Sequence, residues 1–296
     1  MTSREETNMK IKQRIGTGAW YLGVILISIS TVFPLLWTLS TAFKSESEIL
    51  SNSLNLIPRE FTLDHFKEVF SSVPFARYLG NSLVLAVSGV LTNLFFGSLA
   101  GYAFARLPFK GKKTLFLVFL ASMMIPAVVT MIPSFMVLRS FPLAGGNNLL
   151  GQGGLGLINT YWAIIIPGAA GGYSIFFMKQ FFETLPSELA ESARMDGCSE
   201  FMIFLKIYFP LAKTALATLG LMTFQAGWNQ FMWPLIVLNS QDMMTVQVGL
   251  ASFQYNQSAN HGALMAGTVI ATIPMLILFM FTQKYFIKGI GHSGGK

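Results

Sequence analysis

Apolar stretches long enough to cross a lipid bilayer dominate this chain of 296 residues. A membrane-spanning helix needs about 20 mainly apolar residues. Hydrophobic residues make up 53% of the chain and charged residues only 11%, against about 25% charged residues in a typical soluble domain. We therefore expect an all-α polytopic membrane protein with six transmembrane helices. The predicted spans are residues 17–41, 78–105, 114–137, 159–178, 214–238 and 263–285.

The spans are predicted to be helices rather than strands. Lipid offers the backbone no hydrogen-bond partner, so only helices and closed barrels cross a membrane. Barrel strands would show short alternating patterns, whereas residues 115–120 and 163–166 are continuously apolar. The first stretch, 17–41, is longer than the apolar region of about 7–15 residues in a signal peptide, so we expect it to remain as a helix.

Basic residues gather on one side of the predicted spans. Fifteen of the 20 Lys and Arg residues fall in the terminal segments, at the inner end of the last predicted span (Lys284) and in the connections at 106–113 and 179–213, and five fall in the other connections. Cytoplasmic connections are enriched in Lys and Arg. Both termini are therefore expected in the cytoplasm, in a multi-pass membrane protein. The same distribution explains the formal net charge of +7 without a nucleic-acid partner.

This topology predicts one transmembrane domain over residues 1–296, with a cytoplasmic N-terminal segment at 1–16 and a cytoplasmic loop at 179–213. The chain has a single cysteine, so an intrachain disulfide is excluded, and its three histidines are scattered and indicate no metal site. The side chains expected outside are Asn147 and Asn256, and those expected inside are Lys112 and Cys198.

The loop at 179–213 has the pattern of a helical hairpin. Pro186 suits the first turn of a helix, residues 187–195 are good helix formers, and Asp196-Gly197 indicates a turn. Ser199 can cap a second helix. That helix shows an apolar stripe at i, i+3, i+4 and i+7, formed by Phe201, Phe204, Leu205 and Tyr208. A hairpin that lies on the lipid surface and one that docks a protein both fit this pattern.

The hairpin resembles the "EAA" loop of ABC importer permeases. That loop reads Glu-Ala-Ala, three residues, Gly, nine residues, then Ile-x-Leu-Pro, and this chain carries Glu191-Ser-Ala193, Gly197 and Ile207-Tyr-Phe-Pro210 at the same spacing. Ser192 and Phe209 depart from the family pattern, and both residues are compatible with the two predicted helices. The preceding Leu185–Leu189 segment also fits the family.

Further motifs resemble the carbohydrate-uptake branch, and within it the smaller six-span permease of maltose-type transporters. The resemblance covers nearly the whole chain. The motifs are Asn81-Ser82, Gly101-Tyr-Ala-Phe-Ala-Arg106, Ile125-Pro126, and Trp228-Asn229 with Pro234.

The resemblance implies an importer complex in which this chain is not itself an enzyme. Its partners would be a sister permease, two ATP-binding cassette ATPase subunits, an extracytoplasmic solute-binding protein and the carbohydrate. ATP and Mg would be bound by the ATPases, and this chain would hold no cofactor. The first short helix of the loop would enter a cleft of the ATPase, with small Ser192 and Ala193 allowing close approach. The implied coupling residues are Glu188, Glu191, Ser192, Ala193, Asp196 and Gly197.

Polar residues at membrane depth suggest a path for the substrate. Amide groups beside Trp228 and Trp233 suit a sugar, and interhelical hydrogen bonding is the alternative role. The path residues would be Gln225, Trp228, Asn229 and Gln230. In maltose-type permeases the outer loop corresponding to 239–262 reaches into the binding protein. Gln254 and Tyr255 are the expected contacts.

Other functions fit the sequence less well. An ion-coupled transporter usually places carboxylates or histidines inside its spans, and none of the six predicted spans contains Asp, Glu or His. The segment from Gly151 to Gly156 fits G-x-G-x-x-G but has no preceding strand, so it is expected to be a flexible loop rather than a nucleotide site. A related solute such as glycerol phosphate remains an alternative to a sugar. The segments Gly97–Gly101 and Gly168–Gly172 are expected to let helices approach closely.

Overall fold

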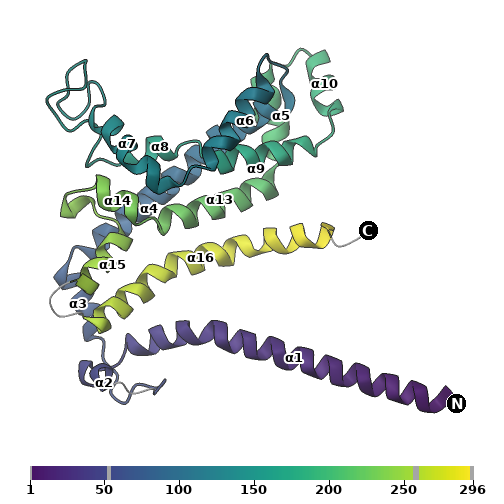
Figure 1. The fold of residues 1–296 in the computed structure, drawn as a ribbon, viewed down its shortest axis with the longest axis vertical. Coiled ribbons are helices and arrows are strands. Elements are labelled where there is room, and N and C mark those ends of the chain that lie inside the picture. The colour runs from purple at the N-terminus through teal and green to yellow at the C-terminus, as the bar shows by residue number, and fades with distance from the viewer. Residues whose placement is uncertain (1, 52–54, 256–259, 294–296) are drawn as a thin grey trace. The chain divides into compact units, whose positions relative to one another are not determined.

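A computed structural model describes residues 2–51, 55–255 and 260–293, and every regular element in these ranges is helical. The contacts divide the chain into two compact units, Met1–Ser72 with Phe253–Ile270 and Val73–Ser252 with Ala271–Lys296. The helices, labelled in Figure 1, are α1 (Thr2–Thr41), α2 (Glu46–Leu50), α3 (Asp64–Ser72), α4 (Phe75–Thr92), η1 (Asn93–Gly97), α5 (Ser98–Arg106), α6 (Lys112–Met123), α7 (Ala127–Arg139), α8 (Trp162–Gly168), α9 (Gly172–Glu183), α10 (Glu188–Met195), α11 (Glu200–Ile203), η2 (Phe204–Tyr208), α12 (Phe209–Leu211), α13 (Lys213–Trp228), α14 (Met232–Val237), η3 (Gln241–Met243), α15 (Val246–Tyr255) and α16 (His261–Ser293).

Three helical stretches in the described residues are long and apolar enough to cross a membrane, namely Gly16–Thr41, Phe75–Arg106 and His261–Gln283. Two bent pairs bring the number to as many as five, α6 with α7 at 104° and the α11–α12 segment with α13 at 82°. The all-α membrane fold is thus confirmed. The predicted span 159–178 is divided between α8 and α9, because Pro167 and the glycine-rich residues after it interrupt the helix.

The first unit combines an apolar helix with a small polar lobe. Leu22 and Ile27 of α1 are exposed, as expected for side chains that meet lipid. In the lobe, the ammonium group of Lys44 lies 4.5 Å from the centre of the Trp37 ring. Nε2 of His65 lies 3.0 Å from the carbonyl oxygen of Lys44. This cation–π contact lets Lys44 be buried at the end of a hydrophobic helix.

The second unit is built on the long span formed by α4, η1 and α5. Helix α9 lies along α5, and α13 lies along α4 (Figure 1). Close approach needs small residues, because a Cβ at Gly97 would lie 2.8 Å from Cβ of Ser174, and one at Gly101 would lie 2.8 Å from Cβ of Met178. The predicted packing role of the Gly97–Gly101 segment is confirmed.

Asn93 stabilises the break between α8 and α9. Its side-chain Nδ2 donates to the carbonyl of Gly168 at 2.6 Å, while its Oδ1 accepts from the backbone N–H of Gly171 at 2.9 Å and from the hydroxyl of Ser174 at 2.7 Å. A broken span leaves backbone groups without helical partners. Asn93 supplies those partners from the middle of a neighbouring span, at the start of the π-helical turn η1.

The connection at 140–158 is a loop without long helices that is closed by hydrogen bonds of Asn147. Nδ2 of Asn147 donates to the carbonyls of Arg139 and Phe141 at 2.8 and 3.0 Å, and its Oδ1 accepts from the N–H of Gly154 at 2.7 Å. Asn147 is therefore buried and would be a poor site for a surface label. Leu150 in the same loop is 78% exposed. Asn256 lies outside the described residues.

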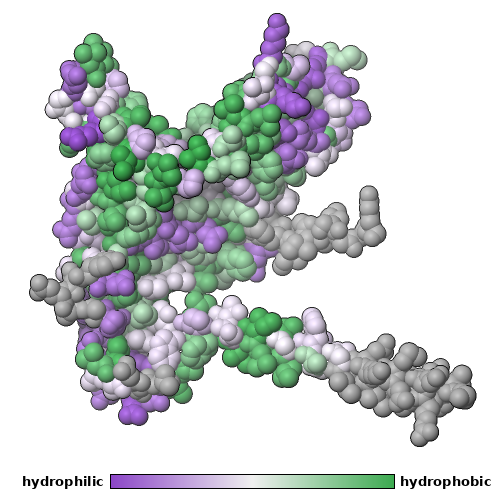
Figure 2. Space-filling model, viewed as in Figure 1, coloured by the Kyte–Doolittle hydropathy of each residue, from purple (hydrophilic) through white to green (hydrophobic). Residues whose placement is uncertain are grey.

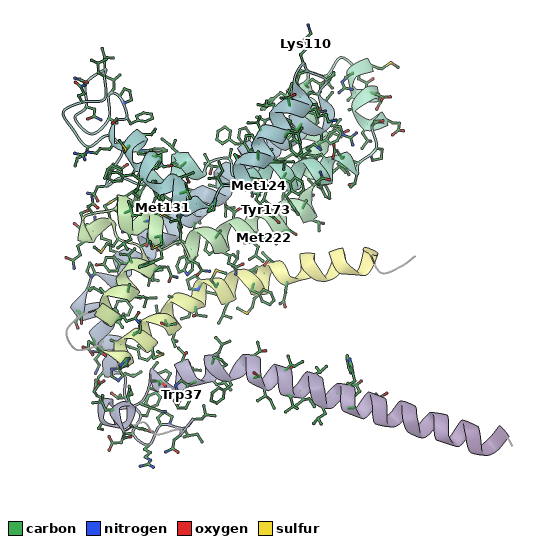
Figure 3. The ribbon with its side chains drawn as sticks, viewed as in Figure 1. Trp37, Lys110, Met124, Met131, Tyr173 and Met222 are labelled. Atoms are coloured by element: carbon green, nitrogen blue, oxygen red, sulfur yellow. The ribbon has the colours of Figure 1, made fainter. Side chains whose placement is uncertain are left out.

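We predict that cysteines at positions 150 and 110 label on opposite sides of the membrane. Lys110 projects from the turn between α5 and α6 (Figure 3), and both side chains are exposed. With Cys198 replaced by Ser, an impermeant maleimide should modify Leu150→Cys on intact cells and modify Lys110→Cys only after lysis. Labelling of both variants on intact cells would contradict the proposed orientation.

Candidate functional site

The helix α10 ends in a turn that requires glycine. The N–H of Gly197 donates to the carbonyl of Arg194, and the N–H of Cys198 donates to that of Ala193, both at 3.0 Å. These two bonds form a Schellman motif. The φ angle of Gly197 is +81°. This conformation is strongly unfavourable for a β-branched residue. The turn predicted at Asp196-Gly197 is confirmed.

The two arms of the hairpin enclose a small apolar core. Ala190 and Ala193 of α10 are buried against a cluster that includes Phe182 of α9 and Ile203 and Phe204 of the second arm. Ala193 therefore lies on the inner face, where its small size lets α10 pack on its own chain. Its small side chain serves this packing and is not on the exposed face that a partner would meet.

The second arm buries a different stripe from the one predicted. Ser199 caps α11 as expected, because its hydroxyl accepts from the N–H of Met202 at 3.4 Å. The turn η2 is a π-helix, which adds one residue to the turn and rotates the side chains that follow. Ile203, which directly precedes η2, lies in the core with Phe204 and Tyr208. The other two predicted stripe residues, Phe201 and Leu205, are exposed.

Polar groups tie the hairpin to the long span. Glu200 accepts from Nε of Arg194 at 2.6 Å and from the hydroxyl of Tyr102, on α5, at 2.8 Å. The bond to Glu200 raises the pKa of the Arg194 guanidinium. One turn further along, at the C-terminal end of α5, Nη2 of Arg106 donates to the carbonyl of Phe182 at 2.6 Å and also to that of Leu185. The hairpin is thus fixed to α5 at two places.

The outer face of α10 remains free of these contacts. Glu188, Glu191, Ser192 and Met195 are exposed and follow a spacing of three or four residues, which places them on one side of the helix. Hydrophilic residues gather around α10, whereas hydrophobic ones cover α6 (Figure 2). Met195 is 90% exposed and was not among the predicted residues, although its position four after Glu191 indicated this face.

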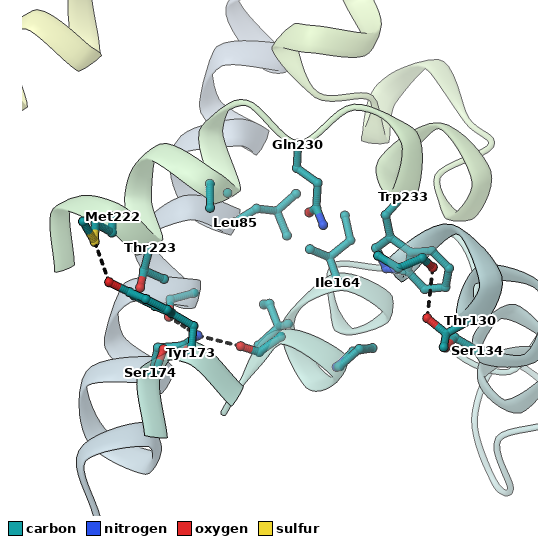
Figure 4. Close-up of a pocket in the computed structure, with 18 of the residues that line it drawn as sticks. Leu85, Thr130, Ser134, Ile164, Tyr173, Ser174, Met222, Thr223, Gln230 and Trp233 are labelled. Atoms are coloured by element: carbon teal, nitrogen blue, oxygen red, sulfur yellow. Dashed lines mark hydrogen bonds between the residues drawn. The ribbon is translucent and has the colours of Figure 1, made fainter. Parts of the chain in front are cut away.

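A cavity of about 540 Å³ lies between α4, α7, α8, α9 and α13. Met131, Tyr173 and Met222, labelled in Figure 3, belong to its lining, which Figure 4 shows in close-up. The C-terminal end of α8, next to the break before α9, contributes Pro167 and Gly168 to its wall. The lining residues are Leu85, Gly89, Asn93, Ala127, Thr130, Met131, Ser134, Ile164, Ile165, Pro167, Gly168, Tyr173, Ser174, Met222, Thr223, Ala226, Gly227, Gln230 and Trp233.

Only Gln230 of the four predicted path residues lines this cavity. Trp228 is buried, stacks on Phe224 and donates from Nε1 to the carbonyl of Ala271 at 3.1 Å, so its contacts are those of helix packing. Gln225 is exposed outside the cavity. Asn229 is exposed and its Oδ1 accepts from Nε2 of Gln247 at 3.4 Å.

The start of the outer loop at 239–262 is anchored by side chains from distant helices. Nδ2 of Asn81 donates to the carbonyls of Asp242 and Met244 at 2.9 and 2.8 Å, and the hydroxyl of Ser82 accepts from the N–H of Val246 at 2.8 Å. The motif Asn81-Ser82 thus has a structural role. Further along, Gln254 of α15 is exposed, and the side chain of Tyr255 lies outside the described residues.

Comparison with known proteins identifies the family of this chain. The family described as the inner membrane component of binding-protein-dependent transport systems matches residues 93–292. The chain belongs to this family. Its members are transport permeases, and residues 93–292 contain both the hairpin and most of the cavity lining.

Relatives extend the likeness over nearly the whole chain. The arabinooligosaccharides transport system permease protein AraQ of Halalkalibacterium halodurans is 37% identical over 283 residues, which cover 94% of this chain and 96% of that protein. AraQ of Bacillus subtilis is 37% identical over 276 residues, 92% of this chain and 93% of that protein. A crystal structure of a bacterial ABC transporter involved in alginate import contains a chain with a TM-score of 0.78 at 25% identity, covering 97% of this chain and 99% of that one. The expected importer permease fold is confirmed.

We predict that Glu200→Gln loosens the hairpin. Arg194 and Glu200 are 38% and 40% exposed, and ion pairs of this kind are worth up to about 1 kcal/mol. Hydrogen exchange of the α10 amides in the purified protein should therefore accelerate by about fivefold. Glu183→Gln, which removes the Lys179–Glu183 pair within α9, is the matched control and should leave α10 unchanged. Equal exchange of α10 in Glu200→Gln and in the unmodified protein would refute the anchoring role.

Proposed function

We propose that this permease is a membrane-spanning subunit of an ATP-driven carbohydrate importer. It forms the translocation pathway with a sister permease and works with two ATPase subunits and an external solute-binding protein. The family match supports the transport role. The names of the AraQ relatives and of the alginate transporter support a carbohydrate.

The observation that carries this proposal is an exposed helix fixed to a membrane span. The outer face of α10 offers Glu188 and Glu191 to a basic cleft and Met195 to an apolar pocket. Because Glu200 and Arg106 hold the hairpin on α5, a displacement of α10 moves the span with it. The hairpin therefore couples the ATPase to the membrane domain.

Transport follows from two states of the complex. The ATPase subunits bind ATP and Mg and close, and α10 carries that motion to the spans. The cavity then opens outward, receives the sugar from the binding protein, and opens inward after hydrolysis. Each ligand shifts the population toward the state that it binds more tightly.

The orientation follows from the same proposal. The hairpin and both termini lie in the cytoplasm, and the outer loop at 239–262 faces the solute-binding protein. The membrane is the bacterial cytoplasmic membrane, consistent with the excess of Lys and Arg on the hairpin side.

Gly197→Val should abolish most transport, whereas Gly197→Asn should retain it. No atom lies within 4 Å of a Cβ built at Gly197, so backbone strain is the main difference between the variants. Asn tolerates positive φ, and Val does not. The measurements are uptake and substrate-stimulated ATP hydrolysis of the reconstituted complex, with copurification of the ATPase. Glu191→Ala should be milder, weakening ATPase binding by about tenfold, because the backbone is unchanged. Wild-type uptake and stimulation in Gly197→Val would rule out coupling through this hairpin.

Gln254→Cys should crosslink to the solute-binding protein. Gln254 is exposed on α15, in the outer loop. A maleimide–benzophenone probe on this cysteine, with Cys198 replaced by Ser, should insert into the binding protein on illumination when ATP is bound, and Leu150→Cys in a different outer loop is the comparison site. If an active transporter gives no crosslink from any position at 239–254, this loop does not contact the binding protein.

A further inference from the structure

Three polar side chains of the cavity are free to bind a ligand. Gln230 projects toward the centre of the cavity, with Ser134 and Thr223 on opposite sides of it (Figure 4). Within the described part of the chain, the side chains of these three residues make no hydrogen bond to protein. An amide and two hydroxyls can each donate and accept, as a sugar hydroxyl also does.

The other polar groups of the wall are already engaged. Asn93 and Ser174 bond to each other and to the broken span, and the hydroxyl of Thr130 donates to the carbonyl of Ala127 at 2.9 Å. Gln230, Ser134 and Thr223 are therefore the groups whose hydrogen-bonding capacity faces the cavity.

Two aromatic rings lie on opposite sides of the cavity and are held in place by hydrogen bonds. Nε1 of Trp233 donates to the carbonyl of Ala163 at 3.0 Å, and the hydroxyl of Tyr173 lies 3.1 Å from the sulfur of Met222. Fixed aromatic faces with a few placed polar groups are typical of small-molecule sites. The volume, about 540 Å³, falls within the roughly 300–1,000 Å³ range of such sites.

The lining also carries no charge. It contains no Asp, Glu, Lys, Arg or His among the residues that form the wall, and a charged group buried without a partner is strongly disfavoured. We propose that this cavity is a subsite for one uncharged glycosyl ring, provided by this chain itself. Gln230, Ser134 and Thr223 bind its hydroxyls, and Trp233 and Tyr173 flank the ring. The assignment rests on the proposed carbohydrate function.

Uptake by the whole complex tests the subsite. The complex is purified through this chain, reconstituted with its binding protein, and assayed with neutral arabinotriose, lactose and maltotriose and with acidic trigalacturonate. Gln230→Leu should lower the turnover of a neutral probe by about tenfold, and Thr223→Val by about threefold, because each removes a hydrogen bond made in the cavity. Gln225→Leu is the matched control, since that glutamine is exposed outside the cavity, and it should retain wild-type turnover.

The outcomes separate this inference from the proposed function. Calorimetry on the binding protein alone fixes its affinity for each probe, so a loss of turnover in Gln230→Leu is assigned to the permease. Equal turnover in Gln230→Leu and Gln225→Leu, with sugar still imported, overturns the subsite alone. Import of trigalacturonate in preference to every neutral probe overturns its selectivity for uncharged rings. Failure of all four probes to drive uptake or to stimulate ATP hydrolysis counts against the carbohydrate function itself.

Discussion

The inability of lipid to hydrogen-bond the backbone is the constraint on which this structure depends. A span can break inside the membrane only where other protein groups take over its free donors and acceptors. Asn93 does this for the break between α8 and α9, through the carbonyl of Gly168 and the N–H of Gly171. The break borders the cavity, because α8 ends with Pro167 and Gly168 in the cavity wall. One asparagine thus makes an irregular backbone compatible with the bilayer.

The hairpin, outside the apolar region, also depends on contacts with other parts of the chain. A short helix such as α10 is marginal alone, and its stability comes from the alanines that pack inward and from the bonds through Glu200 and Arg106. These contacts leave one face exposed and orient it relative to α5. Because the hairpin is fixed to α5, a displacement of α10 by a partner would also displace α5. A flexible hairpin would move without displacing α5.

The sequence was sufficient for features that depend on local chemistry. The apolar helices, the glycine turn at Gly197 and the Ser199 cap all follow from composition and spacing. Features that depend on tertiary contacts were not accessible in this way. The second arm buries Ile203, Phe204 and Tyr208 because these residues meet side chains of α5, α9 and α10. Trp228 and Gln230 lie two residues apart, and the sequence predicts the same role for both. Their contacts in the fold show that Trp228 packs between helices and that Gln230 lines a cavity.

The Schellman turn places the chain's single cysteine, Cys198, at the C-terminal end of α10. The backbone N–H of Cys198 is held by the carbonyl of Ala193, while its side chain is exposed. A fluorophore or spin probe attached there would have a fixed backbone anchor beside the exposed face of α10. In the isolated subunit no cysteine has to be removed first, because this chain has no other thiol. The native protein therefore carries a spectroscopic reporter position at the point where an ATPase would bind.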